Sequence, residues 1–461
     1  MAVTVTRMEP MEAVTPRPRA AWIGGRPEPG EETAPVRHAY DGTEVATVSL
    51  PSAAQVERAV AGAARFAGET RSVPAHARAA VLDRLARAVE SRADEFAELL
   101  TAEAAAPLTL AATEVRLAVA TLRHAARFAG ETSSRAHLDG PDAPGHPDRP
   151  AVRVTRQVPR GVALGLVSPH RALASTSVAV GAALAVGTPV VVVPTPRAAL
   201  STLALAETLA DVLATTALPA GVFSVLPARA PDLLVGDPRL CPITTPAGRS
   251  RVTVLPDWPD VSDAAAAVAA SVVDWEGRSH LPVRDVVVHA TSAERFVEAL
   301  TAALSAHRVG DPYDAAVAVG ALPDEDAARR TLAWVTEARS RGADVPLGGE
   351  RTGTVVHPTL VTGLPVEALP ERVALGPVVT VSVADTLDTA LAAGLCPPGP
   401  APRAVGVFTR DLDLAQHAAE RTTAGQVVVG DVPRRRPGDV RDAARALRRE
   451  VVTVLAVGGR P

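Results

Sequence analysis

The sequence contains no lysine and no asparagine, and isoleucine occurs only at Ile23 and Ile243. All 47 basic residues are therefore arginines. A genome that avoids AT-rich codons explains this bias, and its chemical consequence holds whatever the cause. Without lysine the chain can form no Schiff base and offers no ammonium point charge, and without asparagine it lacks a compact amide donor.

Other features are also scarce. Cys241 and Cys396 lie far apart and form neither a disulfide framework nor a zinc pattern, so we expect a reducing, cytoplasmic setting. The 11 histidines do not cluster with carboxylates at a metal-ligand spacing, so no metal site is expected. A net charge of -4 provides no basic field for a nucleic acid. Neither a signal-type apolar segment nor an uncharged apolar run of about 18 residues is found, so no membrane helix is expected.

The chain is long and rich in apolar residues. Its 461 residues, 47% of them hydrophobic, exceed what one core usually holds, which predicts two or more domains. Apolar residues recur at spacings of three and four from Ala75 to Leu100, a pattern typical of an amphipathic helix. A second helix is predicted over 108–128. The aperiodic segment 134–149 is interpreted as a loop or hairpin that crosses between domains.

Short apolar runs then alternate with alanine-rich stretches. Strands are predicted at 161–167, 189–193 and 221–226, separated by helices at 174–186 and 200–215. A second alternation begins after 256–259, with a strand at 285–288 and helices at 293–307 and 324–341. This order is typical of parallel sheets covered on both faces.

Near the end of the chain, apolar runs at 426–429 and 451–457 flank an arginine-rich stretch, 433–450. That stretch could form an amphipathic helix with a solvated face or, alternatively, a phosphate site.

Phrases in a fixed order along nearly the whole chain resemble aldehyde dehydrogenases. They are WIGG (22–25), VPRGVALGLVSP (158–169), AALAVGTPVVVVPTP (182–196), LPAGVFSVLP (218–227), RVGDP (308–312), HPTLV (357–361), LGPV (375–378) and VFTRDLDLA (407–415). Glu103 and Glu114 also fall on family positions. The resemblance implies an α/β fold with a Rossmann-like cofactor domain at 1–130 and 158–250. It further implies a catalytic-type α/β domain at 251–431 and a strand-based oligomerisation element at 131–157 and 432–461.

In that family a cysteine thiolate attacks an aldehyde, an asparagine amide stabilises the oxyanion, and a glutamate activates water. The family's Gly-Gln-x-Cys turn resembles residues 275–280 ahead of Arg284. Counting from Gly277 places His280 at the cysteine position, whereas counting back from Arg284 places Ser279 there. Neither is a thiol. Either Ser279 and His280 act as nucleophile and base, or, as the simpler interpretation has it, the segment is a polar surface turn.

The oxyanion asparagine falls on Arg171, in the phrase that begins with Ser168 and Pro169, which the resemblance implies are degenerate cofactor positions. An arginine could stabilise an oxyanion, but its long side chain and planar guanidinium differ in shape from the asparagine amide. The loss of one oxyanion donor typically costs about a hundredfold in rate. The resemblance therefore puts the catalytic role of this position in doubt.

The family's cofactor contacts are also replaced. The lysine that holds the adenosine ribose falls on Val193, ahead of Pro194, and the glutamate that holds the nicotinamide ribose falls on Val373, with Leu375 in place of an aromatic residue. Segment 246–251 spans a region roughly twenty residues shorter than the family's, too short for the helix that faces the pyrophosphate. The glutamate base is lost with it. Arginines 249 and 251 could still hold a phosphate, the alternative being a tight loop.

Codon bias explains the missing lysine and asparagine but not the missing cysteine and glutamates, because glutamate is abundant in this chain. We therefore predict a non-catalytic family member that binds no cofactor, or NAD or NADP if any. It would act as a structural or regulatory subunit, in a homo-oligomer or with a catalytic aldehyde dehydrogenase. The alternatives are an NAD(P)-dependent aldehyde oxidoreductase with altered residues, a hydrolase using Ser279 or His280, and a sensor that binds a small molecule in the cleft that is the family's active site.

Overall fold

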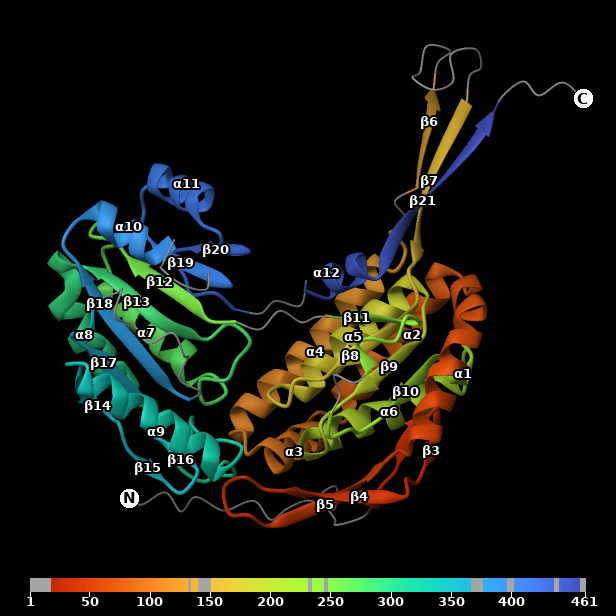
Figure 1. The fold of residues 1–461 in the computed structure, drawn as a ribbon, viewed down its shortest axis with the longest axis horizontal. Helices are drawn as coiled ribbons and strands as arrows, with labels where there is room; N and C mark the ends of the chain where they lie inside the picture. The colour runs from red at the N-terminus through yellow and green to blue at the C-terminus, as the bar shows by residue number, and fades with distance from the viewer. Residues whose placement is uncertain are drawn as a thin grey trace, which may run out of the picture.

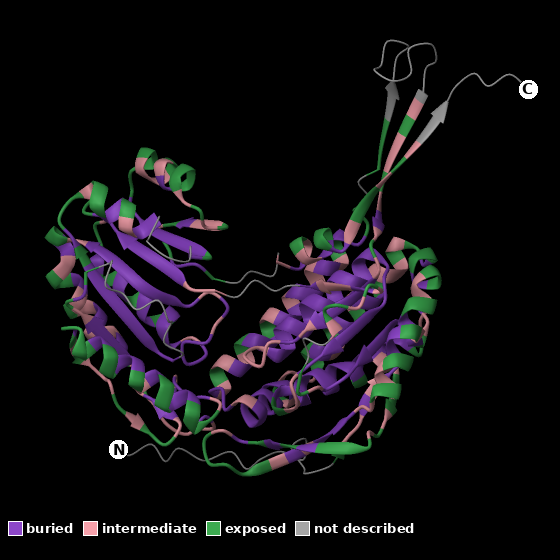
Figure 2. Ribbon diagram, in the orientation of Figure 1, coloured by how far each residue is buried: buried purple, intermediate pink, exposed green. Residues whose placement is uncertain are grey.

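The computed structural model describes residues 18–131, 134–139, 151–230, 234–243, 248–365, 376–395, 402–434 and 439–456. In these residues a six-stranded and a seven-stranded sheet are each covered by helices, and three smaller sheets accompany them (Figure 1). The predicted α/β class is confirmed. Buried residues concentrate along the two large sheets and on the helices against them (Figure 2).

The N-terminal part forms short strands and then four helices. They are β1 (Pro18–Arg19), β2 (Ala21–Ile23), β3 (Arg26–Glu28), β4 (Glu32–Arg37), β5 (Glu44–Leu50), α1 (Ala53–Ser72), α2 (Ala75–Ser91), α3 (Ala93–Ala104) and α4 (Leu108–Phe128). The prediction of one helix from Ala75 to Leu100 was wrong, because the helix breaks at Arg92 (φ -111°, ψ 26°). Val89 and Phe96 are both buried and lie seven residues apart, which places them on one face of a continuous helix, so the apolar spacing gives no sign of the break. The helix predicted over 108–128 is confirmed.

The six-stranded sheet and its helices are called the first unit. Its further elements are β8 (Val162–Leu166), α5 (Ala172–Val186), β9 (Val190–Val193), a 3-10 turn η2 (Pro196–Ala198), α6 (Leu200–Leu213), a second 3-10 turn η3 (Ala220–Val222), β10 (Phe223–Val225) and β11 (Leu240–Ile243). The strand order is β11-β8-β9-β10-β2-β3, and the first four strands run parallel. Every residue of α5 is buried, which explains why its sequence consists mostly of small and apolar residues. The strands and helices predicted here are confirmed to within a few residues.

The seven-stranded sheet and its helices are called the second unit. Its strands are β12 (Ser250–Val254), β13 (Val283–His289), β14 (Asp344–Leu347), β17 (Thr359–Thr362), β18 (Val378–Ala384), β19 (Ala404–Phe408) and β20 (Gln426–Val429). They lie in the order β14-β17-β18-β13-β12-β19-β20, and all except β14 are parallel to their neighbours. The remaining elements are α7 (Val261–Val273), α8 (Ala290–Ser305), α9 (Glu325–Ser340), α10 (Leu387–Leu395), α11 (Leu412–Arg421) and the hairpin β15 (Arg351–Thr352) to β16 (Val355–Val356).

The valines of β13 show why this sheet is covered on both faces. Val286 and Val288 belong to the apolar cluster that includes residues of α7 and α8, whereas Val287 belongs to the cluster that includes residues of α10. Successive side chains of a strand point to opposite faces, so a continuous valine run buries both.

A three-stranded sheet, called the arm, projects away from both units (Figure 1). It consists of β6 (Arg135–Asp139), β7 (Ala151–Pro159) and β21 (Arg448–Ala456), with β7 in the middle. The antiparallel pairing of β6 with β7 agrees with the predicted hairpin, although residues 140–150 lie outside the described part. The amphipathic helix predicted in 433–450 is present as α12 (Asp439–Ala446). Its Arg441 pairs with Glu131 at the base of the arm.

The hairpin of β4 and β5 links the two units. Its strands pair with each other, and its turn reaches the second unit, where Thr354 Oγ1 donates to the carbonyl of Ala39 at 2.7 Å. In Figure 1 this hairpin runs along the bottom of the molecule, from the helices of the first unit toward β15 and β16. Among the described residues, no helix is both long and apolar enough to cross a membrane.

Candidate active site

The turn that connects α7 to β13 adopts an unusual backbone conformation. Trp275, Glu276 and Gly277 have φ values of 53°, 51° and 71° in succession. A side chain at Gly277 would collide with the carbonyl of Gly376, so only glycine fits there. The guanidinium of Arg284, at the start of β13, donates to the carbonyls of Gly277 and Gly376 and so holds the turn against the segment of Gly376. Three left-handed residues in a row persist only where surrounding contacts hold them.

The turn is buried, so its interpretation as a polar surface turn was wrong. Glu276 is 0% exposed, Arg278 8% and His280 5%, while Ser279 is partly buried. Charged side chains tolerate burial only when they are paired and hydrogen-bonded. The sequence alone did not show the partners that make this burial possible.

Arg278 is bound on several sides. Its Nη2 lies 2.7 Å from Glu276 Oε2, and its Nη1 lies 3.1 Å from Nδ1 of His170. It also donates to the backbone carbonyls of Trp275 and Ala321, both at 3.3 Å. Burial raises the pKa of Glu276, and the nearby Arg278 opposes that shift. The guanidinium therefore joins a buried carboxyl of its own turn to a histidine of the first unit.

His170 precedes α5 in the loop that follows β8. Burial lowers its pKa well below the ordinary value, and the positive charge of Arg278 lowers it further. A neutral imidazole has one ring nitrogen that accepts, so Nδ1 of His170 accepts from Arg278. The backbone N–H of His170 donates to Ser168 Oγ at 3.4 Å, and both Ser168 and Pro169 are partly buried.

Arg171, at the oxyanion position, is the N-cap of α5 and has a φ of 109°. Its Nη2 lies 2.5 Å from Asp274 Oδ2, and its guanidinium lies over the ring of Trp275, 5.9 Å from the centroid. Asp274 and Trp275 belong to the second unit, so the ion pair of Arg171 with Asp274 joins the two units. In this pair the arginine comes from the first unit, whereas in the contact of Arg278 with His170 it comes from the second. These two contacts, Arg171 with Asp274 and Arg278 with His170, hold the loop with the predicted positions 168–171 beside the turn that leads to positions 279–280.

The sequence reasoning missed Asp274, Glu276 and Arg278 as members of this site. The signal that could have found them is a run of charged residues directly beside a tryptophan and a glycine, between a buried helix and a buried strand. Two arginines and two carboxyls within a few residues of the expected nucleophile predict ion pairing.

Two of the predicted cofactor positions, Val193 and Pro194, present no polar side chain. Val193 is 1% exposed and lies in an apolar cluster with Leu164, Val191 and Leu226. The backbone carbonyls of Val193 and Pro194 accept from Val167 and Ala228. Val373 and Leu375 lie outside the described residues.

The connector between the two large sheets is short. β11 ends at Ile243 and β12 begins at Ser250, so residues 244–249 alone join them, of which 244–247 are not described. One helical turn already takes about four residues, so a helix with its flanking turns does not fit into this connector.

Arg251 does not offer its charge to a phosphate. Its side chain is 3% exposed, its Nη2 lies 3.0 Å from Asp285 Oδ2 and its Nη1 donates to the carbonyl of Ala393. Arg249 lies 3.8 Å from the same carboxylate oxygen. These contacts favour the tight-loop alternative. No cluster of three or more metal-binding side chains occurs among the residues that the structure describes.

Two buried glutamates, Glu103 of α3 and Glu114 of α4, accept hydrogen bonds from the N-termini of α6 and α5. Glu103 Oε2 accepts from the backbone N–H groups of Leu200 and Ser201 at 2.6 and 3.3 Å, and Ser201 Oγ donates to its other oxygen. Glu114 Oε1 accepts from the N–H of Ala174 at 3.0 Å. The first N–H groups of a helix are its natural anion-binding groups, and here internal carboxyls take several of them.

Two sheets, each covered by helices, are joined by a short connector. The loop before α5 in the first unit contacts the turn after α7 in the second, so the chain has a two-unit α/β architecture with its candidate site between the units. Residues 26–245 and 244–440 match the model of the aldehyde dehydrogenase family, and the chain belongs to that family.

Similar proteins span nearly the whole chain. It is 26% identical over 444 residues to 3-sulfolactaldehyde dehydrogenase of Priestia aryabhattai, covering 89% of each chain. Its fold is similar to that of aldehyde dehydrogenase 21 from Physcomitrella patens, solved in complex with the reaction product succinate (TM-score 0.88, 23% identity, 96% and 99% of the two chains). It is also similar to that of an NADP-dependent glyceraldehyde-3-phosphate dehydrogenase from Bacillus halodurans complexed with NADP (TM-score 0.86, 21% identity, 95% and 99%).

Glu103 makes stability depend on pH. Burial raises its pKa from 4.5 to about 8, so folding favours the protonated form. The contribution is complete below pH 4.5 and is lost as the pH rises through about 8, by at most about 1.4 kcal/mol per pH unit. Glu103→Gln keeps a neutral acceptor, so we expect its free energy of unfolding to fall less steeply with pH, measured by chemical denaturation at pH 5, 7 and 9.

Glu298→Gln, an exposed change on α8, is the matched control and should retain the slope of the unmodified protein. Parallel pH profiles for all three proteins would show that Glu103 does not set this dependence.

Proposed function

We propose that this chain is a non-catalytic member of the aldehyde dehydrogenase family that serves as a structural or regulatory subunit. The observation that carries the proposal is the pairing of Arg171 with Asp274 and of Arg278 with Glu276 and His170. Arg171 falls on the family's oxyanion position, and Glu276 and Arg278 lie in the turn directly before its nucleophile position. A covalent adduct needs a nucleophile, and the positions that could supply one hold Ser279 and His280.

The electrostatics of the site support the same proposal. An oxyanion is stabilised by donors that are already aimed at it and not yet neutralised. The guanidinium of Arg171 is instead held by the carboxylate of Asp274. Removing one such donor costs about two to three orders of magnitude in rate in enzymes that depend on it. The positive charge of the site is therefore used inside the protein rather than offered to a substrate.

We also infer that the chain does not hold NAD or NADP in the way its relatives would. Val193 offers no donor, and the connector 244–249 is too short for a phosphate-facing helix. The residues present thus do not fit a dinucleotide.

The arm is the part of the chain that we assign to subunit pairing, as an oligomerisation element made of 131–157 and 432–461. Its outer strands β6 and β21 are sheet edges, as is β20 of the second unit. Val452 on β21 is 50% exposed and Val429 on β20 is 47% exposed. Strand edges with exposed valines favour pairing with another chain. The partner is a second copy or a catalytic aldehyde dehydrogenase, in a cytoplasmic setting.

The rival function is an NAD(P)-dependent aldehyde oxidoreductase with altered residues. It is favoured by the names of the similar proteins, which are dehydrogenases. Ser279 or His280 would then have to replace the thiolate, which requires an aligned base or an activated imidazole.

A ligand titration separates the two functions. With millimolar NAD or NADP we expect no change in melting temperature and no aldehyde-dependent absorbance change, because the site lacks cofactor contacts. A site saturated about 100-fold would add about 2.7 kcal/mol of stability and could not be missed. The variant His280→Cys should remain inactive, because a thiol alone restores neither the oxyanion donor nor the cofactor contacts. A saturable shift with turnover would overturn the proposal.

Assembly is tested by analytical ultracentrifugation of the purified chain, alone and mixed with a catalytic family member. We expect an assembly that Val452→Asp or Val429→Asp weakens at least tenfold, because a charge on a paired edge is costly. Val235→Asp, at a similarly exposed valine away from the arm, should leave assembly unchanged. A monomer under both conditions would contradict a subunit role for the arm.

A further inference from the structure

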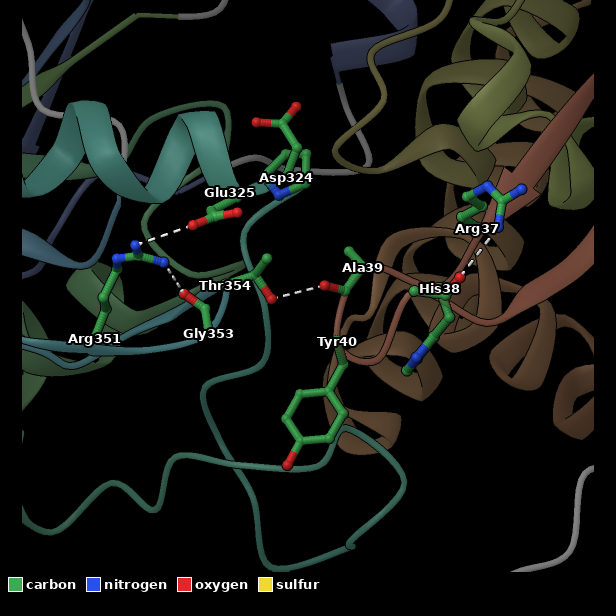
Figure 3. Close-up of a pocket in the computed structure, with 11 residues that line it drawn as sticks. Arg37, His38, Ala39, Tyr40, Asp324, Glu325, Arg351, Gly353 and Thr354 are labelled. Atoms are coloured by element: carbon green, nitrogen blue, oxygen red, sulfur yellow. Dashed lines mark hydrogen bonds and ion pairs between the residues drawn. The ribbon is translucent and has the colours of Figure 1, made fainter.

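A cavity of about 430 Å³ lies where the hairpin of β4 and β5 meets the second unit (Figure 3). Three segments far apart in the sequence line it: residues 37–40 and Gly42 of the hairpin, 323–325 at the start of α9, and Arg351, Gly353 and Thr354 of the hairpin β15–β16. Neither Arg171 nor Arg278 lines it, so it is distinct from the candidate active site. A cavity of this size at a junction of units is typical of small-molecule sites.

The cavity walls carry balanced charge. Arg37 comes from the first unit, whereas Asp324, Glu325 and Arg351 come from the second. Arg351 lies 3.2 Å from Glu325 and donates to the carbonyl of Gly353. In Figure 3, Arg37 lies at one end of the view, and the carboxylates of Asp324 and Glu325 lie between it and Arg351. A ligand with one charge of each sign would therefore meet a carboxylate at one end and a guanidinium at the other.

Both arginines retain donors. Arg37 bonds to Glu44 at 2.9 Å and to the carbonyl of Gly42 at 3.4 Å, and side chains of this type carry more N–H groups than two bonds use. The Arg37 side chain is 59% exposed, so its remaining N–H groups can turn toward a ligand. A guanidinium fork is well matched to a carboxylate.

His38, which lines the cavity, carries an unsatisfied buried nitrogen. The residue is 3% exposed, yet its Nε2 is buried without a hydrogen-bond partner in the described part of the chain. Nδ1 lies 3.2 Å from Asp41, so when that nitrogen carries the proton, Nε2 is an acceptor that lacks a donor. Buried polar atoms of this kind are rare and need an explanation. Nε2 has under 1 Å² of accessible surface, so a bound molecule satisfies it only if the His38 ring turns toward the cavity that the residue lines.

The two tyrosines of the chain, Tyr40 and Tyr313, both flank His38, with ring centroids 6.3 and 5.5 Å from it. Tyr40 is 39% exposed and forms one wall of the cavity (Figure 3). An aromatic face attracts a cationic group, which fits a ligand that carries an ammonium.

We propose that this cavity binds a free amino acid. The ammonium faces the carboxylate of Glu325, and the ligand carboxylate faces Arg37. Asp324 contributes negative charge nearby, but its Oδ1 caps α9 and its Oδ2 pairs with Arg197. A zwitterion matches walls that hold two guanidiniums and two carboxylates. A phosphate would pair with the guanidiniums but would leave the carboxylates facing a like charge. Since the cavity is formed by both units, the bound amino acid stabilises their contact through the hairpin.

The test is a thermal-shift screen of the common amino acids at about 10 mM, followed by calorimetry on the strongest. We expect at least one to bind with a Kd below about 1 mM. Its N-acetyl derivative, which lacks the ammonium, and its amide, which lacks the carboxylate, should each bind at least tenfold more weakly. Arg37→Gln and Glu325→Gln should weaken binding by a similar factor. The exposed controls Arg295→Gln and Glu298→Gln on α8 should leave it unchanged.

Three results would overturn the proposal: no amino acid binds at about 10 mM, the derivatives bind as tightly as the parent, or Arg37→Gln and Glu325→Gln bind normally. Binding that is lost in Arg171→Gln but retained in Arg37→Gln would place the ligand in the candidate active site instead. Circular dichroism and melting temperatures of the variants establish that each is folded. The outcome is independent of whether the chain is catalytic.

Discussion

The buried pair of Arg278 and Glu276 is the constraint on which the candidate site depends. Two charges inside a protein are tolerated only when they neutralise each other and their remaining hydrogen-bonding groups are satisfied. Here Gly320, Trp275, Ala321 and His170 complete that set. The left-handed backbone of the turn follows from the same requirement, because it folds Glu276 back toward the guanidinium.

This arrangement explains how a chain can keep a family's fold while we propose a different use for its central cleft. The sheets depend on valine runs and buried helices, and none of those residues takes part in chemistry. The cleft residues are free to change once chemistry is not selected, and here they form bridges between the units. Arg171 reaches into the second unit and Arg278 reaches into the first, so the surfaces that would close on a substrate are fastened to each other.

Much of the fold could be predicted from the sequence, because strand and helix periodicity is local. The run Val286 to Val288 predicts a strand with two buried faces, and the helix over 108–128 has the predicted bounds. The break at Arg92 and the burial of His280 were not predicted, because both depend on partners distant in the sequence. Asp274 lies 103 residues from Arg171, and no local pattern connects them. The domain boundaries, the loss of cofactor binding and the choice of partner stay predictions.

The most direct test of the central claim is a double-mutant cycle on the buried pair, with Glu276→Gln, Arg278→Met and the double variant compared by chemical denaturation. If the two side chains hold each other, each single change should cost about 3–5 kcal/mol, because it leaves a buried group without its partner. The double variant should then cost at least about 1 kcal/mol less than the sum. Effects that add within about 0.5 kcal/mol would contradict the account, because Arg278 and Glu276 would then not stabilise each other in the folded protein.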